Sequence, residues 1–444
     1  MKKNKDKKIG LNMKILVVIA FVGLLPLSWY RMFSDSEAKE TQYKEYLQVA
    51  REKSAMGITK VAKEYYDQAF TLNKSYEIQC EVARMYLDNG EIDKYVGYCL
   101  DLVGGYPKEV LAYEYLAEHY YITEQYAEIF KMQDALKKRK GVSEKINTYC
   151  DELQYEYTET TTDFTEVLGA SSGYIGVHDE KKGWGFTDLS GKLMGYGYAA
   201  ISPYNAAGYA GVTDKEGRSY IVDSSNEKIY VDPEKRNITF IGYITNTNFP
   251  IVMDGKYYTC DLKFNISEKS YDYISSFNYS KAAARQGDTW FFIDTSGERI
   301  SDKTYEDIKV DDCGLIYMAE RNFVKKDGYY QLIDINETVV SEQKYEDAWA
   351  FVGTEPTAVK MDGKWGYIDA TGTVVIQPQY HQARPFSNGF AGVYDLMEWK
   401  YINEKNEVVI AGQFDEIREF TSKKTAFVKY GAKWKVIILT KYNY

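Results

Sequence analysis

The stretch from Met361 to Ile410 decides the fold, because it restates one strand motif within itself. It reads MDGKWGYIDATGTVVI, then QPQYHQARPFSNGFAGVYDLME, then WKYINEKNEVVI. Residues 365–369 and 399–403 are the same five-residue strand, 34 residues apart. A fixed period of this size predicts a repeat architecture, in which each repeat is one small structural unit.

The first aromatic residue of this strand recurs through the second half of the chain. The series is Trp184, Tyr257, Trp290, Tyr330, Trp365, Trp399 and Trp434, with Ser219 at the one copy that is not aromatic. The steps run from 33 to 40 residues, and the longest separates Trp290 from Tyr330. Aromatic residues at a structural period favour a packing role over a sugar-stacking surface.

An acidic or amide residue follows four positions after each of these strand starts. The series is Asp188, Asp223, Asp261, Asp294, Asp334, Asp369 and Asn403. Three residues later a left-handed residue is expected, and these positions hold Gly191, Asn226, Gly297, Gly372 and Asn406. Gly and Asn tolerate positive φ, and Asp accepts a hydrogen bond from backbone two residues on, so Asp-x-x-Gly predicts a short hairpin. Phe264 and Glu337 interrupt this pattern and predict two turns that are longer or differently built.

The motif resembles the WG-repeat (KWG-type) family of bacterial proteins. The best copy is Gly363-Lys364-Trp365-Gly366-Tyr367-Ile368-Asp369 with Gly372, and Lys182-Gly183-Trp184-Gly185 is a second. The resemblance covers roughly residues 164–444 in about eight repeats. It implies a β-rich binding or interaction module without catalytic residues.

Each repeat of about 35 residues reads as four short strands. In the clearest copy these are residues 380–384, 389–394, 399–403 and 407–410. Four short strands suit one blade of a β-propeller, and an open β-solenoid of stacked hairpins is the alternative. An eighth unit starts at Phe414, and the sequence after Leu439 supplies no last strand for it.

The N-terminus predicts a membrane anchor. Residues 1–14 hold six lysines, and residues 15–30 carry no charge. With residues 31–33 this run approaches the length of a transmembrane helix, and the positive-inside rule places residues 1–14 in the cytoplasm and the rest outside. A cleaved signal peptide is the competing reading, but Leu27-Ser28-Trp29-Tyr30 lacks a small-residue cleavage pattern.

Residues 34–155 predict a domain of paired helices. Val49-Ala50-Arg51 recurs as Val82-Ala83-Arg84 and then as Leu116-Ala117-Glu118, at steps of 33 and 34 residues, with Gly57 and Gly90 at turns between helices. The pattern resembles tetratricopeptide repeats, which present a surface to a partner protein. A spacer that holds the β domain away from the membrane is the alternative. The Thr-rich segment within residues 156–163 predicts a linker between the two domains.

Composition excludes several classes of function. The whole chain has a net charge of −10. Six lysines and one aspartate give residues 1–14 a charge of +5, so the rest of the chain has a charge of −15. An acidic body of this kind does not favour binding to nucleic acid. The five cysteines form no C-x-x-C pair, and none of the three histidines lies in a metal or nucleophile motif. We therefore expect no enzyme, no cofactor and no metal site.

The sequence thus predicts a single-pass, membrane-anchored, extracytoplasmic protein with a protein partner. The β repeats serve as a binding scaffold in this interpretation. The alternative is a receptor for cell-wall glycan or a small ligand, in which the aromatic series would point outward on one rim.

Overall fold

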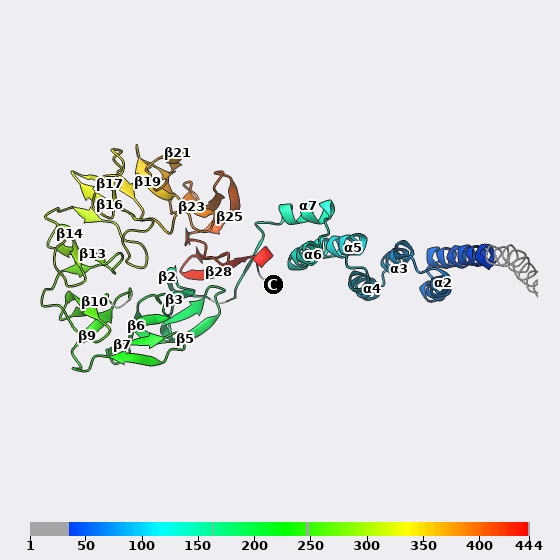
Figure 1. Ribbon diagram of the computed structural model, residues 1–444, viewed down its shortest axis with the longest axis horizontal. Coiled ribbons are helices and arrows are strands. Elements are labelled where there is room, and N and C mark those ends of the chain that lie inside the picture. The colour runs from blue at the N-terminus through cyan, green and yellow to red at the C-terminus, as the bar shows by residue number, and fades with distance from the viewer. Residues whose placement is uncertain (1–34, 162, 246–247, 443–444) are drawn as a thin grey trace, which may run out of the picture. The chain divides into compact units, whose positions relative to one another are not determined.

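The computed structural model describes residues 35–161, 163–245 and 248–442, which belong to two compact units (Figure 1). The boundary between the units falls between Leu153 and Gln154. The first unit is helical and the second is built from β-strands, so the predicted order of a helical region followed by a β region is confirmed.

The helical unit consists of successive short helices. A first helix includes residues 35–55, and the later helices of the described part are α2 (Thr59–Leu72), α3 (Tyr76–Asp88), α4 (Ile92–Gly105), α5 (Leu111–Ile122), α6 (Tyr126–Lys138) and α7 (Glu144–Glu152). Gly57 and Gly90 have φ of 74° and 73°, as expected at turns between helices. Ser75 caps the N-terminus of α3, because its hydroxyl accepts a hydrogen bond from the Ile78 N–H.

Small and aromatic side chains form the core between these helices. Ala50, Ala62, Ala83 and Ala117 are fully buried, which allows the helices to approach one another closely. Cys80, Cys99 and Cys150 are buried among these helices. The resemblance of this unit to tetratricopeptide repeats stays a prediction.

The predicted anchor at residues 15–33 and the basic segment 1–14 lie outside the described residues. Within the described part of the chain, no helix combines the length and the apolar character needed to cross a membrane.

The described part of the β unit contains seven antiparallel sheets, and the seven-stranded one joins two repeats, so the unit has eight repeats. We call these blades 1 to 8. In Figure 1 the blades follow one another around a ring, from green β2 to red β28. This arrangement is propeller-like, as predicted.

The strands of the first four blades are short and mostly six residues or fewer. Blade 1 contains β2 (Glu166–Ser171), β3 (Tyr174–Asp179), β4 (Gly183–Asp188) and the first half of β5 (Leu193–Ile201); blade 2 contains the rest of β5, β6 (Tyr209–Asp214), β7 (Ser219–Asp223) and β8 (Lys228–Val231); blade 3 contains β9 (Ile238–Ile241), β10 (Asn248–Met253) and β11 (Lys256–Asp261); blade 4 contains β12 (Tyr273–Ile274), β13 (Lys281–Gln286) and β14 (Thr289–Asp294).

The remaining four blades repeat the same order. Blade 5 contains β15 (Asp307–Ile308), β16 (Arg321–Lys326) and β17 (Tyr329–Asp334); blade 6 contains β18 (Asp347–Ala348), β19 (Thr357–Met361), β20 (Lys364–Ile368) and β21 (Val374–Tyr380); blade 7 contains β22 (Gln382–Ala383), β23 (Phe390–Tyr394), β24 (Trp399–Asn403) and β25 (Val408–Phe414); blade 8 contains β26 (Glu416–Ile417), β27 (Thr425–Tyr430), β28 (Lys433–Leu439) and β1 (Tyr157–Glu159). In blades 3 to 5 isolated bridges, such as Ile293 with Arg299, stand in for the outer strand.

Strand β1 supplies the fourth strand of blade 8 and closes the ring. It pairs antiparallel with β28, with Tyr157 opposite Leu439. Phe164 and Val167, which begin blade 1, pack with Phe427 and Trp434 of blade 8. The alternative of an open solenoid is therefore wrong, because the first and last blades share a core.

The predicted linker at residues 156–163 is also corrected, since it contains β1. The segment is polar, which favoured a linker, but an outer strand of a blade has one solvated face and accepts polar residues. Thr158 lies opposite Ile438 in the register of this strand.

Candidate functional site

The acidic residues of the repeat series all cap tight hairpin turns. In each, the side-chain Oδ1 accepts hydrogen bonds from the backbone N–H groups two and four residues on: Asp188, Asp223, Asp261, Asp294, Asp334, Asp369 and Asn403. At Asp369 these donors are Thr371 at 2.9 Å and Thr373 at 3.0 Å. Gly191, Gly297 and Gly372 take the left-handed position, with φ of 80°, 88° and 85°.

The two turns expected to differ are built the same way, so that prediction is wrong. Phe264 and Glu337 have φ of 60° and 58°, and each N–H bonds to the carbonyl of the aspartate three residues before it. Side-chain burial offsets the strain of these conformations. The Phe264 ring packs in the core of blade 3, and the Glu337 carboxylate accepts a 2.7 Å hydrogen bond from the Tyr305 hydroxyl.

The aromatic series lies between blades rather than on an outer rim. Tyr330, Trp365, Trp399 and Trp434 are buried, and Trp184, Tyr257 and Trp290 are partly buried. Each packs against side chains of the following blade. Trp365, for example, shares a cluster with Ala383, Phe386 and Val393 of blade 7.

Blade 5 carries an insertion that the other blades lack. Ile274 and Phe277 occupy core positions of blade 4 that Ile308 and Tyr317 occupy in blade 5. The separation in sequence is six residues longer in blade 5, and the additional residues are 311–316. This blade 5 insertion accounts for the 40-residue step between the neighbouring aromatic residues.

The blade 5 insertion contains a further Asp-x-x-Gly turn, which places its residues rigidly. The Asp311 Oδ1 accepts hydrogen bonds of 2.8 Å from the N–H groups of Cys313 and Leu315, and the Gly314 N–H bonds to the Asp311 carbonyl. The pair Asp311-Asp312 reads in the sequence as a solvated surface turn. The structure shows such a turn with Asp312 exposed, and it adds that both residues line a cavity at the axis of the ring.

Contacts with blades 4 and 1 hold the insertion in place. The Ser276 N–H of blade 4 donates to the Gly314 carbonyl at 2.8 Å. Gly169 of blade 1 lies so close that a Cβ on it would come within 2.9 Å of the Asp312 Cβ. A side chain at that glycine would push the insertion away.

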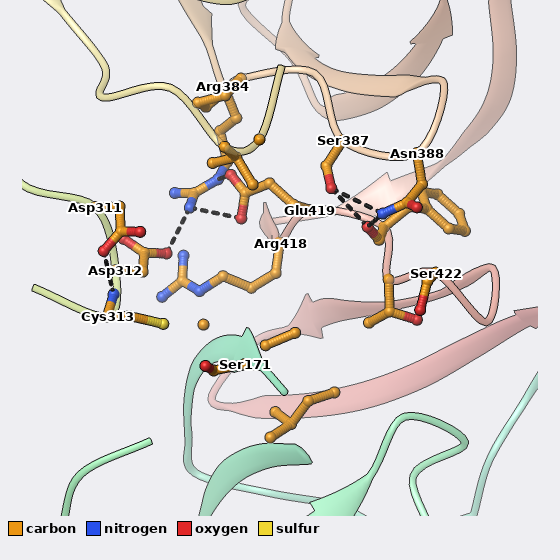
Figure 2. A pocket seen from close by; sticks show the side chains of 18 of the residues that line it. Ser171, Asp311, Asp312, Cys313, Arg384, Ser387, Asn388, Arg418, Glu419 and Ser422 are labelled. Carbon is orange, nitrogen blue, oxygen red and sulfur yellow. Dashed lines mark hydrogen bonds and ion pairs between the residues drawn. The ribbon is translucent and has the colours of Figure 1, made fainter. Parts of the chain in front are cut away.

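Arg384 of blade 7 is the central cation of this region (Figure 2). Its guanidinium lies 2.9 Å from Asp312 and 2.7 Å from Glu419 of blade 8, and it stacks over the ring of Trp349 in blade 6 at 4.6 Å. The Arg384 side chain is only 8% exposed. Burial lowers the pKa of Arg384, but Glu419 and Asp312 outweigh this effect, and the net direction is upward.

The cavity that Arg384 helps to line has a volume of about 440 Å³. Ligand pockets of proteins typically have a few hundred Å³. The loops after the first strands of blades 5 to 8 form one part of its wall, and blade 1 forms the other. Polar lining residues labelled in Figure 2 are Ser171, Asp311, Asp312, Cys313, Arg384, Ser387, Asn388, Arg418, Glu419 and Ser422. We call this cavity the axial pocket.

Burial shifts the titration of two groups in the axial pocket. It raises the pKa of Asp311 to about 7, against the two backbone hydrogen bonds that lower it, and Asp312 and Glu419 add to the rise. Burial also raises the pKa of the Cys313 thiol well above its ordinary value. Asp311 therefore changes its charge near neutral pH.

A second cavity lies on the other side of Arg384. It is lined by Trp349, Trp365, Trp399, Gln382, Tyr394, Asp415, Glu416 and Arg384 itself. Trp349 and Arg384 line both cavities, so this stacked pair separates them. Within the described residues, no group of three or more His, Cys, Asp or Glu side chains is arranged to hold a metal ion.

The family described as WG containing repeat matches three segments of the β unit, residues 265–290, 365–394 and 399–434. The prediction of WG repeats is confirmed for these segments. No curated protein matches the sequence.

Several solved propeller-type structures are similar to this chain. BamB from Moraxella catarrhalis matches at 10% identity and a TM-score of 0.39, over 64% of this chain and 99% of that one. The WD40 domain of SCAP from fission yeast matches at 10% identity and a TM-score of 0.37, over 65% of this chain and 98% of that one. The β-propeller domain of Cps50 (Swd1) from Myceliophteria thermophila matches at 6% identity and a TM-score of 0.36, over 63% and 98%. At these TM-scores the likenesses support no function, and the description of the ring rests on its strand pairing.

Proposed function

We propose that this chain is a membrane-anchored, extracytoplasmic, non-catalytic scaffold whose β unit binds a protein partner at the axial pocket. The proposal rests on the axial pocket and on the charged residues that line it. The blade 5 insertion and Arg384 form an ion pair across the axis, and they line a cavity of about 440 Å³ together with other charged side chains. A concave site with a few oriented polar groups is typical of binding sites.

The burial of the aromatic series weighs against a glycan receptor, the alternative. Sugar stacking requires exposed ring faces, whereas Trp399 is 8% exposed and Trp434 is 2% exposed. In this proposal the helical unit, which resembles tetratricopeptide repeats, provides a second protein-binding surface. The acidic body supports the exclusion of nucleic acid as a partner.

Capture of partner proteins from envelope extract tests the binding role. Thr354 is an exposed residue of the pocket wall, and Val408 is 54% exposed on the outer strand of blade 7. We expect the wild-type chain and Val408→Trp to retain a partner that Thr354→Trp loses, because the new indole obstructs the pocket. A partner retained equally by both variants would refute binding at the axial pocket.

A reporter fused after Tyr444 tests the location. A reporter that works only in the cytoplasm should be inactive, because six lysines before the uncharged run place residues 1–14 inside. An active reporter would contradict the extracytoplasmic location.

A further inference from the structure

The charges of the axial pocket do not balance. Its charged lining residues are Asp311, Asp312, Glu355, Glu419, Arg384 and Arg418. The single charge of Arg384 is shared by Asp312 and Glu419, and Arg418, which also lines the pocket, forms a 2.8 Å ion pair with Glu416. Four carboxylates thus face two guanidinium groups, so the wall carries an excess of negative charge, and Asp311 forms no ion pair within the described part of the chain.

Asp311 presents one free carboxylate oxygen to this cavity. Both of its backbone hydrogen bonds go to Oδ1, and no residue in the described part of the chain donates a hydrogen bond to Oδ2. The turn already holds the carboxylate in place, so binding of a ligand to Oδ2 costs the protein little conformational entropy.

The rest of the wall suits an alkyl chain. Leu168, Trp349 and Phe420 provide apolar surface in the same cavity. Lysine and arginine side chains combine such a stem with a cationic end, and they bury the stem on apolar surface.

We propose that the axial pocket binds an ammonium or guanidinium group carried on an alkyl stem, with the Asp311 carboxylate as its counter-ion. The proposal rests on the binding function proposed above and names the chemistry that is bound. This chemistry has two sources, a lysine or arginine side chain of the partner protein and a free small amine.

The pH dependence of binding follows from Asp311. Its pKa of about 7 makes the carboxylate mostly neutral at about pH 6 and mostly ionised at about pH 8, whereas an alkylammonium stays charged throughout. The groups facing Asp311 are Asp312 and Cys313 of the insertion, Glu355, Arg384, Arg418 and Glu419. The cation should therefore bind more tightly at the higher pH.

Calorimetric titration of the full-length chain tests the proposal. The probes are cadaverine and the blocked peptide acetyl-Gly-Lys-Gly-amide, with 1-pentanol and acetyl-Gly-Gln-Gly-amide as uncharged controls. We expect saturable binding of at least one charged probe, about tenfold tighter at about pH 8 than at about pH 6, and no binding of the uncharged controls.

The variant Asp311→Asn isolates the charge, because the asparagine Oδ1 can accept the same two backbone N–H groups. At about pH 8 it should weaken binding about tenfold or more and remove the pH dependence. Asp334→Asn is the matched control, because Asp334 accepts the equivalent pair of hydrogen bonds at 2.8 and 2.9 Å without lining the axial pocket. It should stay within about twofold of wild type.

Each outcome decides a separate point. Binding of both charged probes supports a side chain of the partner as the source, and binding of cadaverine alone supports a free amine. Binding of neither probe, or equal binding by Asp311→Asn and wild type, overturns the cation site. A chain that captures a partner yet binds neither probe would overturn this inference and leave the proposed scaffold function intact.

Discussion

Arg384 and Asp312 form an ion pair of 2.9 Å that joins blade 7 to the blade 5 insertion across the axis of the ring. Sequential contacts alone would connect each blade only to its neighbours. This pair, together with the contact of the insertion with Gly169 of blade 1, links blades that are distant in the chain.

Removal of Arg384 should destabilise the β unit strongly. Arg384→Ala leaves Asp312 and Glu419 facing each other without their cation, and we expect a loss of about 3–5 kcal/mol in the free energy of unfolding. Arg218→Ala is the control, because the Arg218 side chain is 69% exposed and solvent screens its ion pairs, so its removal should change stability little. Chemical denaturation measures both. An equal loss of stability in the two variants would show that the ion pairs of Arg384 do not stabilise the β unit.

Loss of the hydrogen bonds of the closing segment should open the ring. The Thr160 N–H donates to the Val436 carbonyl at 2.9 Å, and Thr160→Pro removes this donor. We expect a cost of about 1–3 kcal/mol and faster amide hydrogen exchange in β28. Amides of β16 and β17 provide the internal control, since they lie far from the closure. Unchanged exchange in β28 would mean that β1 does not hold blade 8.

Trp365 should behave as a core residue. Its side chain is 9% exposed and packs against blade 7, so Trp365→Ala should cost about 3–5 kcal/mol. Met397→Ala is the exposed control, at 87% exposure, and should change stability by less than about 0.5 kcal/mol. Tryptophan fluorescence and far-UV dichroism should be followed together, because repeat units can unfold in parts. A stable Trp365→Ala protein would contradict the packing role.

Asp311 should make stability depend on pH in an unusual direction. The folded chain keeps the Asp311 proton up to about pH 7, whereas an unfolded chain releases it near pH 4. Between these values the folded state binds more protons, so this group lowers stability as pH rises. Asp311→Asn should therefore be more stable than wild type by on the order of 2 kcal/mol at about pH 8, and the difference should vanish toward about pH 4. A variant that is less stable at about pH 8 would contradict the raised pKa.

The local parts of this fold could be predicted from the sequence, and the long-range parts could not. Local strands follow from the 34-residue step between Trp365 and Trp399, and local turns follow from the aspartates three residues before glycine. Short segments of sequence are enough to encode both. The closing strand was missed because Tyr157–Glu159 is short and polar, and its partner lies at the other end of the β unit.

The axial pocket was missed for a related reason. The 40-residue step and the additional Asp-x-x-Gly at Asp311–Gly314 together mark the blade 5 insertion, and this signal is visible in the sequence. Its partners Gly169 and Arg384 follow only from the closed ring, because nothing in their local sequence relates them to the insertion. Glu337 shows the opposite limit, since a buried hydrogen bond with Tyr305 allows a residue that sequence rules disfavour in the turn.

Site-specific photocrosslinking in intact cells is a direct test of partner binding at the axial pocket. A photoreactive amino acid at Ser422, an exposed residue of the axial pocket, is compared with the same group at Val375, which is 48% exposed on the outer strand of blade 6. We expect a discrete crosslinked partner from position 422 and none from position 375. A crosslink from position 375 with none from position 422 would contradict binding at the axial pocket.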